Sequence, residues 1–283
     1  MPLFQVVILA LVQAATEFLP VSSTAHLVLV PWLLGWADHG LLFDIALHVG
    51  TLAAVLIYFA KTWIRLAFLA IGKEVLKPGP GEPDSDLFEN PKLFVFLVAA
   101  TFPAGLAGLA LKDLVETTFR SPFVIGFMLI AIGLVLAFAE KRGTLERDLS
   151  RLSFKDAMAI GFAQAVALIP GTSRSGITMS MAMILGLTRQ SAARFSFLLS
   201  TPIILGAGAK ALLDSADAGG IPPDLYTAFA VGVACSAVAG YLVIAFFLRY
   251  LQRSTFRPFV YYRIIFGIIV LALATFWRFP AAG

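Results

Sequence analysis

Two stretches of sequence decide the fold: Gln13-Ala-Ala-Thr-Glu-Phe-Leu-Pro-Val-Ser-Ser-Thr24 and Gln164-Ala-Val-Ala-Leu-Ile-Pro-Gly-Thr-Ser-Arg-Ser175. Each runs from an apolar segment through Pro into small hydroxyl residues, and the two align with one gap. Downstream, Phe43-Asp-Ile-Ala-Leu-His-Val-Gly50 aligns with Phe195-Ser-Phe-Leu-Leu-Ser-Thr-Pro202 at a similar offset of roughly 150 residues. Similarity at a fixed offset indicates an internal repeat, here of about half the chain.

The composition places this repeat in a membrane. Of the 283 residues, 59% are hydrophobic and 13% are charged, whereas soluble domains carry about 25% charged residues. A helix needs about 20 residues to cross about 30 Å of hydrocarbon. We therefore predict an all-α polytopic membrane protein. Its six full transmembrane helices are predicted at 41–60, 92–111, 123–139, 195–213, 226–248 and 259–279.

Two further pairs of apolar segments surround the two quoted breaks. The predicted arms are 3–19 with 25–36, and 156–169 with 175–187. Three of these four arms are short for a span, so each pair is predicted to form a re-entrant helix–break–helix hairpin, at 3–36 and at 156–187. Irregular backbone at membrane depth requires cover from protein or a water-filled cavity.

Three spans separate the two hairpins. Because three is odd, the halves must be inverted, and the single membrane domain 1–283 divides into a first repeat, 1–139, and a second repeat, 153–283. Partial re-entry from opposite faces then brings both breaks together near the midplane. Many transporters place their binding sites there.

Loop charges predict the orientation. Fourteen of the 21 Lys and Arg residues fall on one side and four on the other, so the positive-inside rule makes the first side cytoplasmic and turns both termini outward. The basic run from Lys141 to Lys155 is interpreted as an orientation signal and lipid-headgroup contact, and 78–91 as a flexible cytoplasmic loop. This loop charge accounts for the net charge of +4, and no nucleic-acid partner is expected.

Processing and redox signals are few. The first Lys or Arg is Lys61, so no cleavable signal is predicted and the first apolar segment is expected to be kept. The single cysteine, Cys235, excludes an internal disulfide and a Cys-rich metal site.

The breaks gather polar residues that are costly at membrane depth. Gln13 and Glu17, at i and i+4, share the face of the first arm that points toward its tip. The candidate residues that follow are Ser22, Ser23, Thr24 and His26 from the first break and Thr172, Ser173, Arg174, Ser175, Gly176 and Thr178 from the second. These types suit a phosphate, because helix N-termini bind anions and Arg offers a fork that matches phosphate oxygens. A Ser with a nearby His can supply a nucleophile and its base.

Each assignment has a structural alternative. Ser22 and Thr172 can be helix caps, Gly171 and Gly176 can serve tight turns, and Gln13 can join two helices. A purely structural Glu17–Arg174 pair and a packing role for His26 also stay open. Asp44 is interpreted as a cap or interfacial anchor, whereas His48, one turn deeper, is left open between structure and function. His39, beside Asp38, is predicted to be solvated.

The segments Glu17-Phe-Leu-Pro-Val-Ser-Ser-Thr-Ala-His26 and Pro170-Gly-Thr-Ser-Arg-Ser-Gly-Ile-Thr178 resemble the two signature motifs of the undecaprenyl-diphosphate phosphatases, the bacitracin-resistance family. The continuation Ala193-Arg-Phe-Ser-Phe-Leu-Leu-Ser-Thr-Pro202 is also similar. The resemblance covers nearly the whole chain. The family's first motif is Glu or Gln, three residues, then Glu; here Gln13 and Glu17 leave one carboxylate where some members have two.

The resemblance implies hydrolysis of undecaprenyl diphosphate to the monophosphate and inorganic phosphate. This recycles the lipid carrier for peptidoglycan at the outer face of the bacterial cytoplasmic membrane and confers bacitracin resistance. It also implies a polyprenyl diphosphate lipid as substrate, contact with membrane lipids, and help from a divalent cation, Mg²⁺ or Ca²⁺, for which Glu17 is the candidate ligand. The sequence leaves a homodimer open.

The mechanism we expect assigns catalysis to Glu17, Ser23, His26 and Arg174. Arg174 and the two helix N-termini hold the diphosphate, Ser23 attacks with His26 as base, and Glu17 orients His26 or binds the cation. Gln13, Ser22, Thr24, Thr172, Ser173, Ser175, Gly176 and Thr178 are predicted to bind substrate. The nucleophile stays open among Ser23, His26 and a water activated by Glu17.

Two rival functions share these features. A secondary transporter or flippase of an anionic lipid would need binding groups but no nucleophile. A phosphatase that also flips its product would need both.

Overall fold

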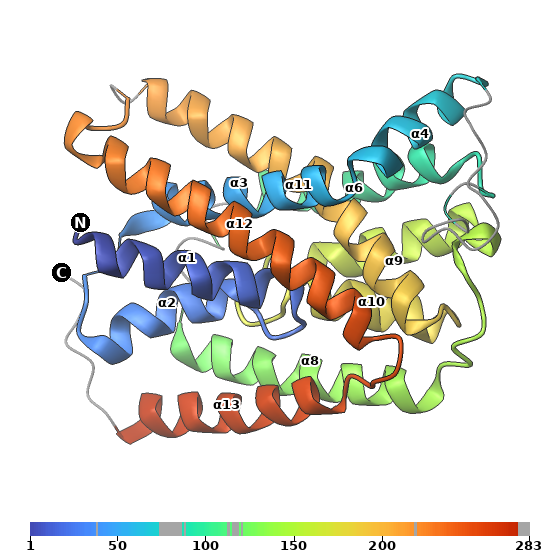
Figure 1. Ribbon diagram of the computed structural model, residues 1–283. Helices are drawn as coiled ribbons and strands as arrows, with labels where there is room; N and C mark the ends of the chain where they lie inside the picture. The colour runs from blue at the N-terminus through green and yellow to red at the C-terminus, as the bar shows by residue number, and fades with distance from the viewer. Residues whose placement is uncertain are drawn as a thin grey trace.

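The computed structural model describes residues 1–37, 39–73, 87, 89–111, 114, 119, 121–217 and 220–276. Within this part of the chain the regular structure is helical (Figure 1). The helices are α1 (Leu3–Phe18), α2 (Ser23–Leu34), α3 (Gly40–Tyr58), α4 (Ala60–Ala70), α6 (Leu93–Ala110), α8 (Pro122–Arg142), η1 (Leu149–Arg151), α9 (Phe154–Val166), α10 (Arg174–Ile184), α11 (Arg189–Asp217), η2 (Pro223–Leu225), α12 (Tyr226–Tyr250) and α13 (Arg257–Phe276).

Six of the described helices are long and apolar enough to cross a membrane: α3, α6, α8, α11, α12 with η2, and α13. The predicted all-α polytopic class is therefore confirmed, and each predicted span overlaps one of these helices. The main difference is α11, which runs from Arg189 to Asp217 rather than from 195 to 213. Hydropathy marks only the apolar part of a helix, and α11 continues past it at both ends through charged residues.

The two predicted hairpins correspond to the pairs α1–α2 and α9–α10, which are broken at 19–22 and 167–173. In Figure 1 the pairs lie toward opposite ends of the molecule, and their connecting segments face each other near its centre. The residues just before α2 and α10, Ser22 and Ser173, have φ angles of 80° and 70°. Both breaks therefore turn through the left-handed region, which non-glycine residues rarely adopt. Re-entry into the membrane remains a prediction.

Helices of the two predicted halves pack against each other reciprocally. The first arm α1 lies on α12, and its counterpart α9 lies on α6. Helices α8 and α13 pack together, as do α3 and α11. The division into repeats 1–139 and 153–283 remains a prediction, and this reciprocal packing is the arrangement that two inverted halves would produce.

One close helix approach fixes the position of α3. A Cβ atom at Gly50 would lie 2.5 Å from the Val233 carbonyl oxygen and 2.6 Å from Ser236 Cβ, both in α12. Only glycine fits there without moving a backbone. The contact sets the depth and rotation of α3, and with it the direction of His48 two residues earlier.

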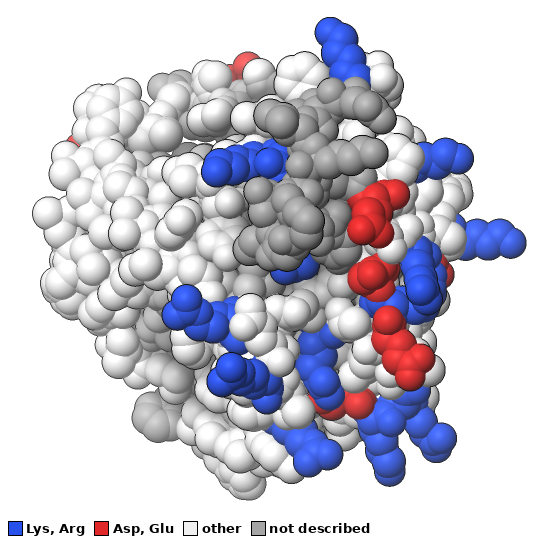
Figure 2. Space-filling model, turned by 45° about the vertical axis from the view of Figure 1, so that its right-hand side comes forward, with Lys and Arg blue, Asp and Glu red and all other residues white. Residues whose placement is uncertain are grey.

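The surface divides into an apolar belt and a charged end. Large side chains such as Phe127, Phe246 and Ile265 are exposed along the spans, as expected for lipid-facing residues. Figure 2 shows Lys and Arg gathered toward one side of the molecule beside a broad uncharged surface. That this end is cytoplasmic remains a prediction. Most of the loop 78–91, together with Asp38, Lys77, Lys112, Arg120 and Arg278, lies outside the described residues.

The second hairpin is tied down at its charged end. Arg147 donates to the Leu185 carbonyl oxygen over 2.6 Å and to Asp156 Oδ2 over 2.7 Å. Ser153 and Asp156 form a capping box at the start of α9, which satisfies two of its free backbone N–H groups. Arg147, in the basic run from 141 to 155, therefore joins α9 to the end of α10 in addition to carrying charge.

Candidate active site

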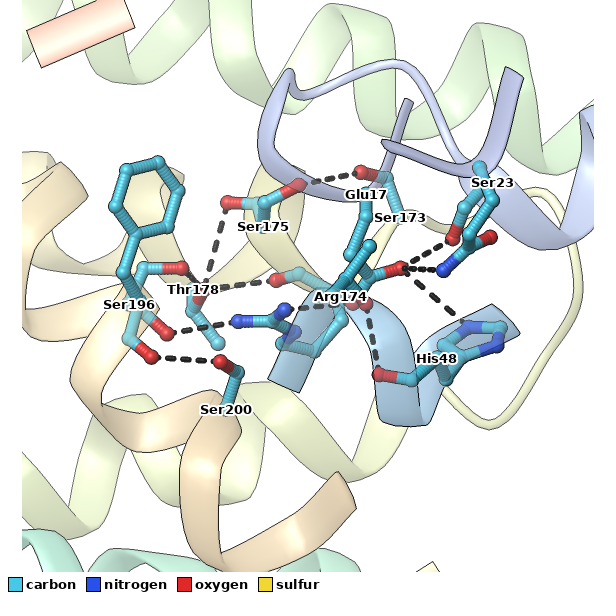
Figure 3. A network of polar contacts seen from close by, with 12 residues as sticks. Glu17, Ser23, His48, Ser173, Arg174, Ser175, Thr178, Ser196 and Ser200 are labelled. Carbon is cyan, nitrogen blue, oxygen red and sulfur yellow. Dashed lines mark hydrogen bonds and ion pairs between the residues drawn. The ribbon is translucent and has the colours of Figure 1, made fainter. Parts of the chain in front are cut away.

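Glu17 lies where the two breaks meet. It belongs to the last turn of α1, and Arg174 is the first residue of α10. Arg174 Nη2 donates to Glu17 Oε1 over 2.7 Å, joining residues 157 positions apart in the chain (Figure 3). Both side chains are largely buried, at 13% and 6% exposed. The predicted carboxylate and guanidinium thus share one site.

Two hydrogen bonds hold the second carboxylate oxygen of Glu17. Ser23 Oγ donates to Oε2 over 2.6 Å, and Gln13 Nε2 donates to the same atom over 3.2 Å. Because Ser23 is the first residue of α2, its hydroxyl lies at a helix N-terminus, where unpaired N–H groups and the helix dipole attract anions. The candidate nucleophile is in direct contact with a carboxylate able to take its proton.

Arg174 is held from its other side by α11. Its Nη1 donates to the Ser196 carbonyl oxygen over 2.7 Å. The Ser196 hydroxyl in turn lies 2.7 Å from Thr178 Oγ1, which also donates to the Arg174 carbonyl oxygen over 2.7 Å. Ser196 was not among the predicted residues. Its signal was available in the repeat, because Ser196 aligns with Asp44.

The remaining hydroxyls of the second break stabilise the break itself. Ser173 caps α10 by accepting from the Gly176 N–H over 3.1 Å. Ser175 Oγ lies 3.2 Å from Ser173 Oγ and donates to the Leu19 carbonyl oxygen over 3.1 Å, which links the two breaks. Thr172 Oγ1 donates to the Val166 carbonyl oxygen, so Thr172 is not the cap of α10. Substrate binding by Thr172, Ser173, Ser175 and Gly176 remains a prediction.

Ser22 and Thr24 belong to the first break. Ser22 occupies the N-cap position of α2, yet its side chain makes no capping hydrogen bond. Its hydroxyl lies 3.3 Å from Thr24 Oγ1. Ser22 is buried and Thr24 is exposed. Neither side chain has a described hydrogen bond to Glu17 or Arg174, and their substrate contacts remain predictions.

His26 faces away from Glu17. Its Nδ1 lies 2.7 Å from the Ser22 carbonyl oxygen and its Nε2 lies 2.6 Å from Tyr262 Oη in α13. The ring stacks on Tyr262 and on Phe266. The expected contacts of His26 with Ser23 and Glu17 are therefore not formed in this structure. Ser23 and His26 are three positions apart on α2 and therefore point in different directions. Ser23 points to Glu17 of α1, whereas His26 points to Tyr262 of α13.

The imidazole that meets Glu17 belongs to His48 of α3. Its Nε2 lies 3.4 Å from Glu17 Oε2, and Figure 3 shows the ring facing the carboxylate beside Ser23. The sequence alone leaves His48 open between a structural and a functional role. Its alignment with Ser200, one turn from Ser196 on the helix that holds Arg174, was the available signal.

A second arginine, Arg263 of α13, holds the two breaks together and was missed as a site residue. Its side chain is fully buried. It donates to five carbonyl oxygens, those of Pro20, Leu129, Met128, Gly171 and Thr172. Because an Arg inside a span costs at least about 2.5 kcal/mol, its presence in the segment 259–279 was a signal that the residue has a specific role.

Replacing Arg263 with Met should destabilise the protein by at least about 3 kcal/mol, because each buried carbonyl left without a donor costs about 1–3 kcal/mol. We expect the melting temperature in detergent to fall by roughly 6–12 °C. Arg257→Met, at the exposed first residue of the same helix, is the matched control and should leave it unchanged. Equal melting temperatures for both variants would contradict the role given to Arg263.

The described residues contain no group of three or more His, Cys, Asp or Glu side chains able to hold a metal ion. Glu17 is the single carboxylate of the cluster. Beside it, Gln13 Oε1 is buried without a described hydrogen-bond partner. Two such oxygens suit a hard cation that also binds substrate phosphates, as Mg²⁺ commonly does.

The geometry supports displacement at a phosphate. Arg174 supplies a positively charged fork, the N-termini of α2 and α10 supply free N–H groups, and Ser23 with Glu17 supplies a hydroxyl and its proton acceptor. Phosphoryl transfer needs mainly positioning and charge neutralisation. All these groups lie on helices rather than on mobile loops.

Comparison with known proteins identifies the family. The sequence matches the family described as "Bacitracin resistance protein BacA" over residues 6–269. It is 48% identical over 271 residues to the undecaprenyl-diphosphatase of Desulforudis audaxviator, covering 96% of this chain and 97% of that protein. It is 45% identical over 279 residues to the undecaprenyl-diphosphatase of Pelotomaculum thermopropionicum, covering 99% of both chains. The protein therefore belongs to the bacitracin resistance protein BacA family.

Proposed function

We propose that this protein hydrolyses undecaprenyl diphosphate to undecaprenyl phosphate and inorganic phosphate at the cluster around Glu17. It is an enzyme, an undecaprenyl-diphosphatase, by its family and by relatives of that name that match nearly its whole length. The contact of Arg174 and Ser23 with opposite oxygens of Glu17 is the observation that supports this site. The same family membership supports a part in bacitracin resistance.

The proposed chemistry starts at Ser23. As its Oγ bonds to the terminal phosphorus, the bond from that phosphorus to the bridging oxygen breaks and undecaprenyl phosphate leaves. The hydroxyl proton moves to Glu17 Oε2 and then to the departing phosphate or to solvent. Arg174 exchanges Glu17 for the phosphate oxygens, where it neutralises the charge that develops.

A water completes the cycle. It attacks the phosphoserine, the Oγ–phosphorus bond breaks, and one water proton stays on the released phosphate. The other returns to Ser23 through Glu17. Two alternatives remain, attack by His26 or by a water that Glu17 activates. For His26 to act, its Nε2 must leave Tyr262 Oη.

The substrate's form supports a membrane site. A polyprenyl diphosphate carries a long apolar tail and a charged head, and the protein is a multi-pass membrane protein with a polar cluster between its helices. We place it in the bacterial cytoplasmic membrane with the orientation that loop charge predicts, and with the site open to the outer side, as the resemblance to the undecaprenyl-diphosphate phosphatases implies. A homodimer remains open.

A divalent cation is part of the proposal. Glu17 and Gln13 Oε1, which has no described hydrogen-bond partner, would hold Mg²⁺ or Ca²⁺, and the cation would neutralise charge on the diphosphate. Chelation with EDTA should lower phosphate release by about tenfold or more, and added Mg²⁺ or Ca²⁺ should restore it. Undiminished phosphate release in EDTA would contradict a role for a divalent cation.

The function is tested by inorganic phosphate release from undecaprenyl diphosphate by the purified protein in detergent. Release at a rate proportional to enzyme is expected. Because detergent leaves no membrane to cross, a transporter would release no phosphate, so this assay separates the two classes. The family and its named relatives do not favour the transporter. A phosphatase that also flips its product would need a separate assay of lipid orientation in vesicles.

A further inference from the structure

Glu17 must lose two of its partners during the proposed reaction. Arg174 leaves Oε1 when it binds the diphosphate, and Ser23 gives up the proton that it shares with Oε2. Glu17 is only 6% exposed, so water cannot freely replace these groups. While Glu17 is still ionised, the loss of its arginine partner leaves a buried charge unpaired, which is strongly destabilising. Some other group must keep Glu17 in place, and among the described residues two further contacts remain, with Gln13 and with His48.

The ring of His48 is oriented for this task. Its Nδ1 lies 2.7 Å from the Asp44 carbonyl oxygen, and a carbonyl only accepts, so Nδ1 carries a proton. Its Nε2 lies 3.4 Å from Glu17 Oε2, and an ionised carboxylate also only accepts. The ring therefore bridges the backbone of α3 and the carboxylate of Glu17, with one nitrogen directed at each.

The backbone under His48 is anchored. Thr51 Oγ1 donates to the His48 carbonyl oxygen over 2.9 Å. Gly50, two residues on, allows the close contact between α3 and α12 described above. Because helix and ring are both held, His48 can fix the position of Glu17 rather than follow it. Gln13, the other remaining contact, reaches the same oxygen from the helix of Glu17 itself, one turn away.

We infer that His48 is a positioning residue for the catalytic carboxylate: its Nε2 contacts Glu17 Oε2 and keeps Glu17 aligned with Ser23 while Arg174 binds the diphosphate. This inference rests on the proposed function. His26 cannot take this part in the present arrangement, because both its ring nitrogens are engaged by Ser22 and Tyr262.

Two variants separate the polar contact from packing. His48→Gln keeps a polar amide at similar reach, whereas His48→Leu fills similar space without a polar atom. We expect His48→Gln to release phosphate within about threefold of the wild-type rate. His48→Leu should lose about 100-fold in kcat, as small misplacements of catalytic groups do, with KM little changed. Full activity of His48→Leu, or equal losses in both variants, would overturn the inference.

A second measurement does not depend on turnover. The melting temperatures of His48→Leu, Glu17→Gln and the double variant form a cycle with the wild type. If His48 holds Glu17, the fall in melting temperature caused by His48→Leu should be at least halved when Glu17 is already replaced. The reason is that the effects of substitutions at contacting residues are not additive. Additive shifts would overturn the pairing. If the wild-type protein releases no phosphate, the proposed function is wrong. The melting temperatures of the four proteins would still test the contact between His48 and Glu17.

Discussion

Replacing Arg174 with Ala should reduce kcat/KM for undecaprenyl diphosphate by about 1,000-fold or more. An arginine that stabilises a transferring phosphoryl group is worth about 10³–10⁵ in rate. Arg174 is the one predicted site residue that brings a positive charge to Glu17 from the second break. Its guanidinium also reaches Ser196 of α11, so its direction is fixed before substrate arrives. Phosphate release by the purified variants gives the comparison.

Arg174→Lys tests whether the planar guanidinium is needed in addition to the positive charge. Arg174→Lys keeps the charge but loses the planar fork, so its activity should lie between those of the wild type and the alanine variant. Arg253→Ala, at an exposed position, controls for the loss of one positive charge. If Arg174→Ala folds with an unchanged melting temperature and turns over at the wild-type rate, the site has been placed wrongly.

Ser23→Ala should lower kcat by about 1,000-fold and abolish any trapped phosphoenzyme. The contact over 2.6 Å between Ser23 Oγ and Glu17 Oε2 gives the hydroxyl a proton acceptor before the reaction begins, which is how a weak serine nucleophile is activated. Rapid quenching of wild-type turnover followed by mass spectrometry should place the phosphate on Ser23.

The matched control for Ser23 is Ser236→Ala. Ser236 is also buried, and its hydroxyl donates to the carbonyl oxygen of Ala10, about two helical turns from Glu17 along α1. It should keep near-normal turnover. Near-normal turnover of Ser23→Ala would exclude Ser23 as nucleophile and favour a water activated by Glu17. Phosphate recovered on His26 would assign the role to that imidazole.

The sequence was sufficient for the six spans, for the two helix pairs around the breaks and for most of the polar cluster, whereas α4 (Ala60–Ala70) was not predicted. Runs of about 20 apolar residues locate spans because the bilayer fixes their length. The two Pro-containing breaks locate the contact of Glu17 with Arg174, since irregular backbone and charge at membrane depth both require a partner. The extra length of α11 could not be read in the same way, because its ends are charged and lie beyond the apolar window.

Which histidine contacts Glu17 depends on how the helices pack. His26 follows Ser23 by three positions, and the sequence suggested that the two act together. In the structure the rotation of α2 sends His26 to Tyr262 and leaves Ser23 on Glu17. His48 reaches Glu17 because Gly50 lets α3 approach α12 closely. A contact between three helices is not visible in the spacing of any one of them.

The buried position of Arg263 also depends on helix packing and could not be read from the sequence. Arg263 lies near the start of the predicted span 259–279, where a long arginine side chain can also reach the interface. Its depth depends on how α13 crosses the two breaks, and there it donates to carbonyl oxygens of both. The left-handed backbone at Ser22 and Ser173 was likewise not predictable, because serine rarely adopts it.

The claim on which the account depends is that the two breaks meet, and a cross-link between them tests it most directly. Leu19→Cys and Ser175→Cys, in a Cys235→Ser background, place thiols on segments joined by the hydrogen bond from Ser175 Oγ to the Leu19 carbonyl oxygen over 3.1 Å. Oxidation, or a short membrane-permeant dithiol reagent, should link them within one chain, as mass spectrometry of the digested monomer would show. If both thiols are modified by a monofunctional reagent yet never become linked, the breaks do not meet.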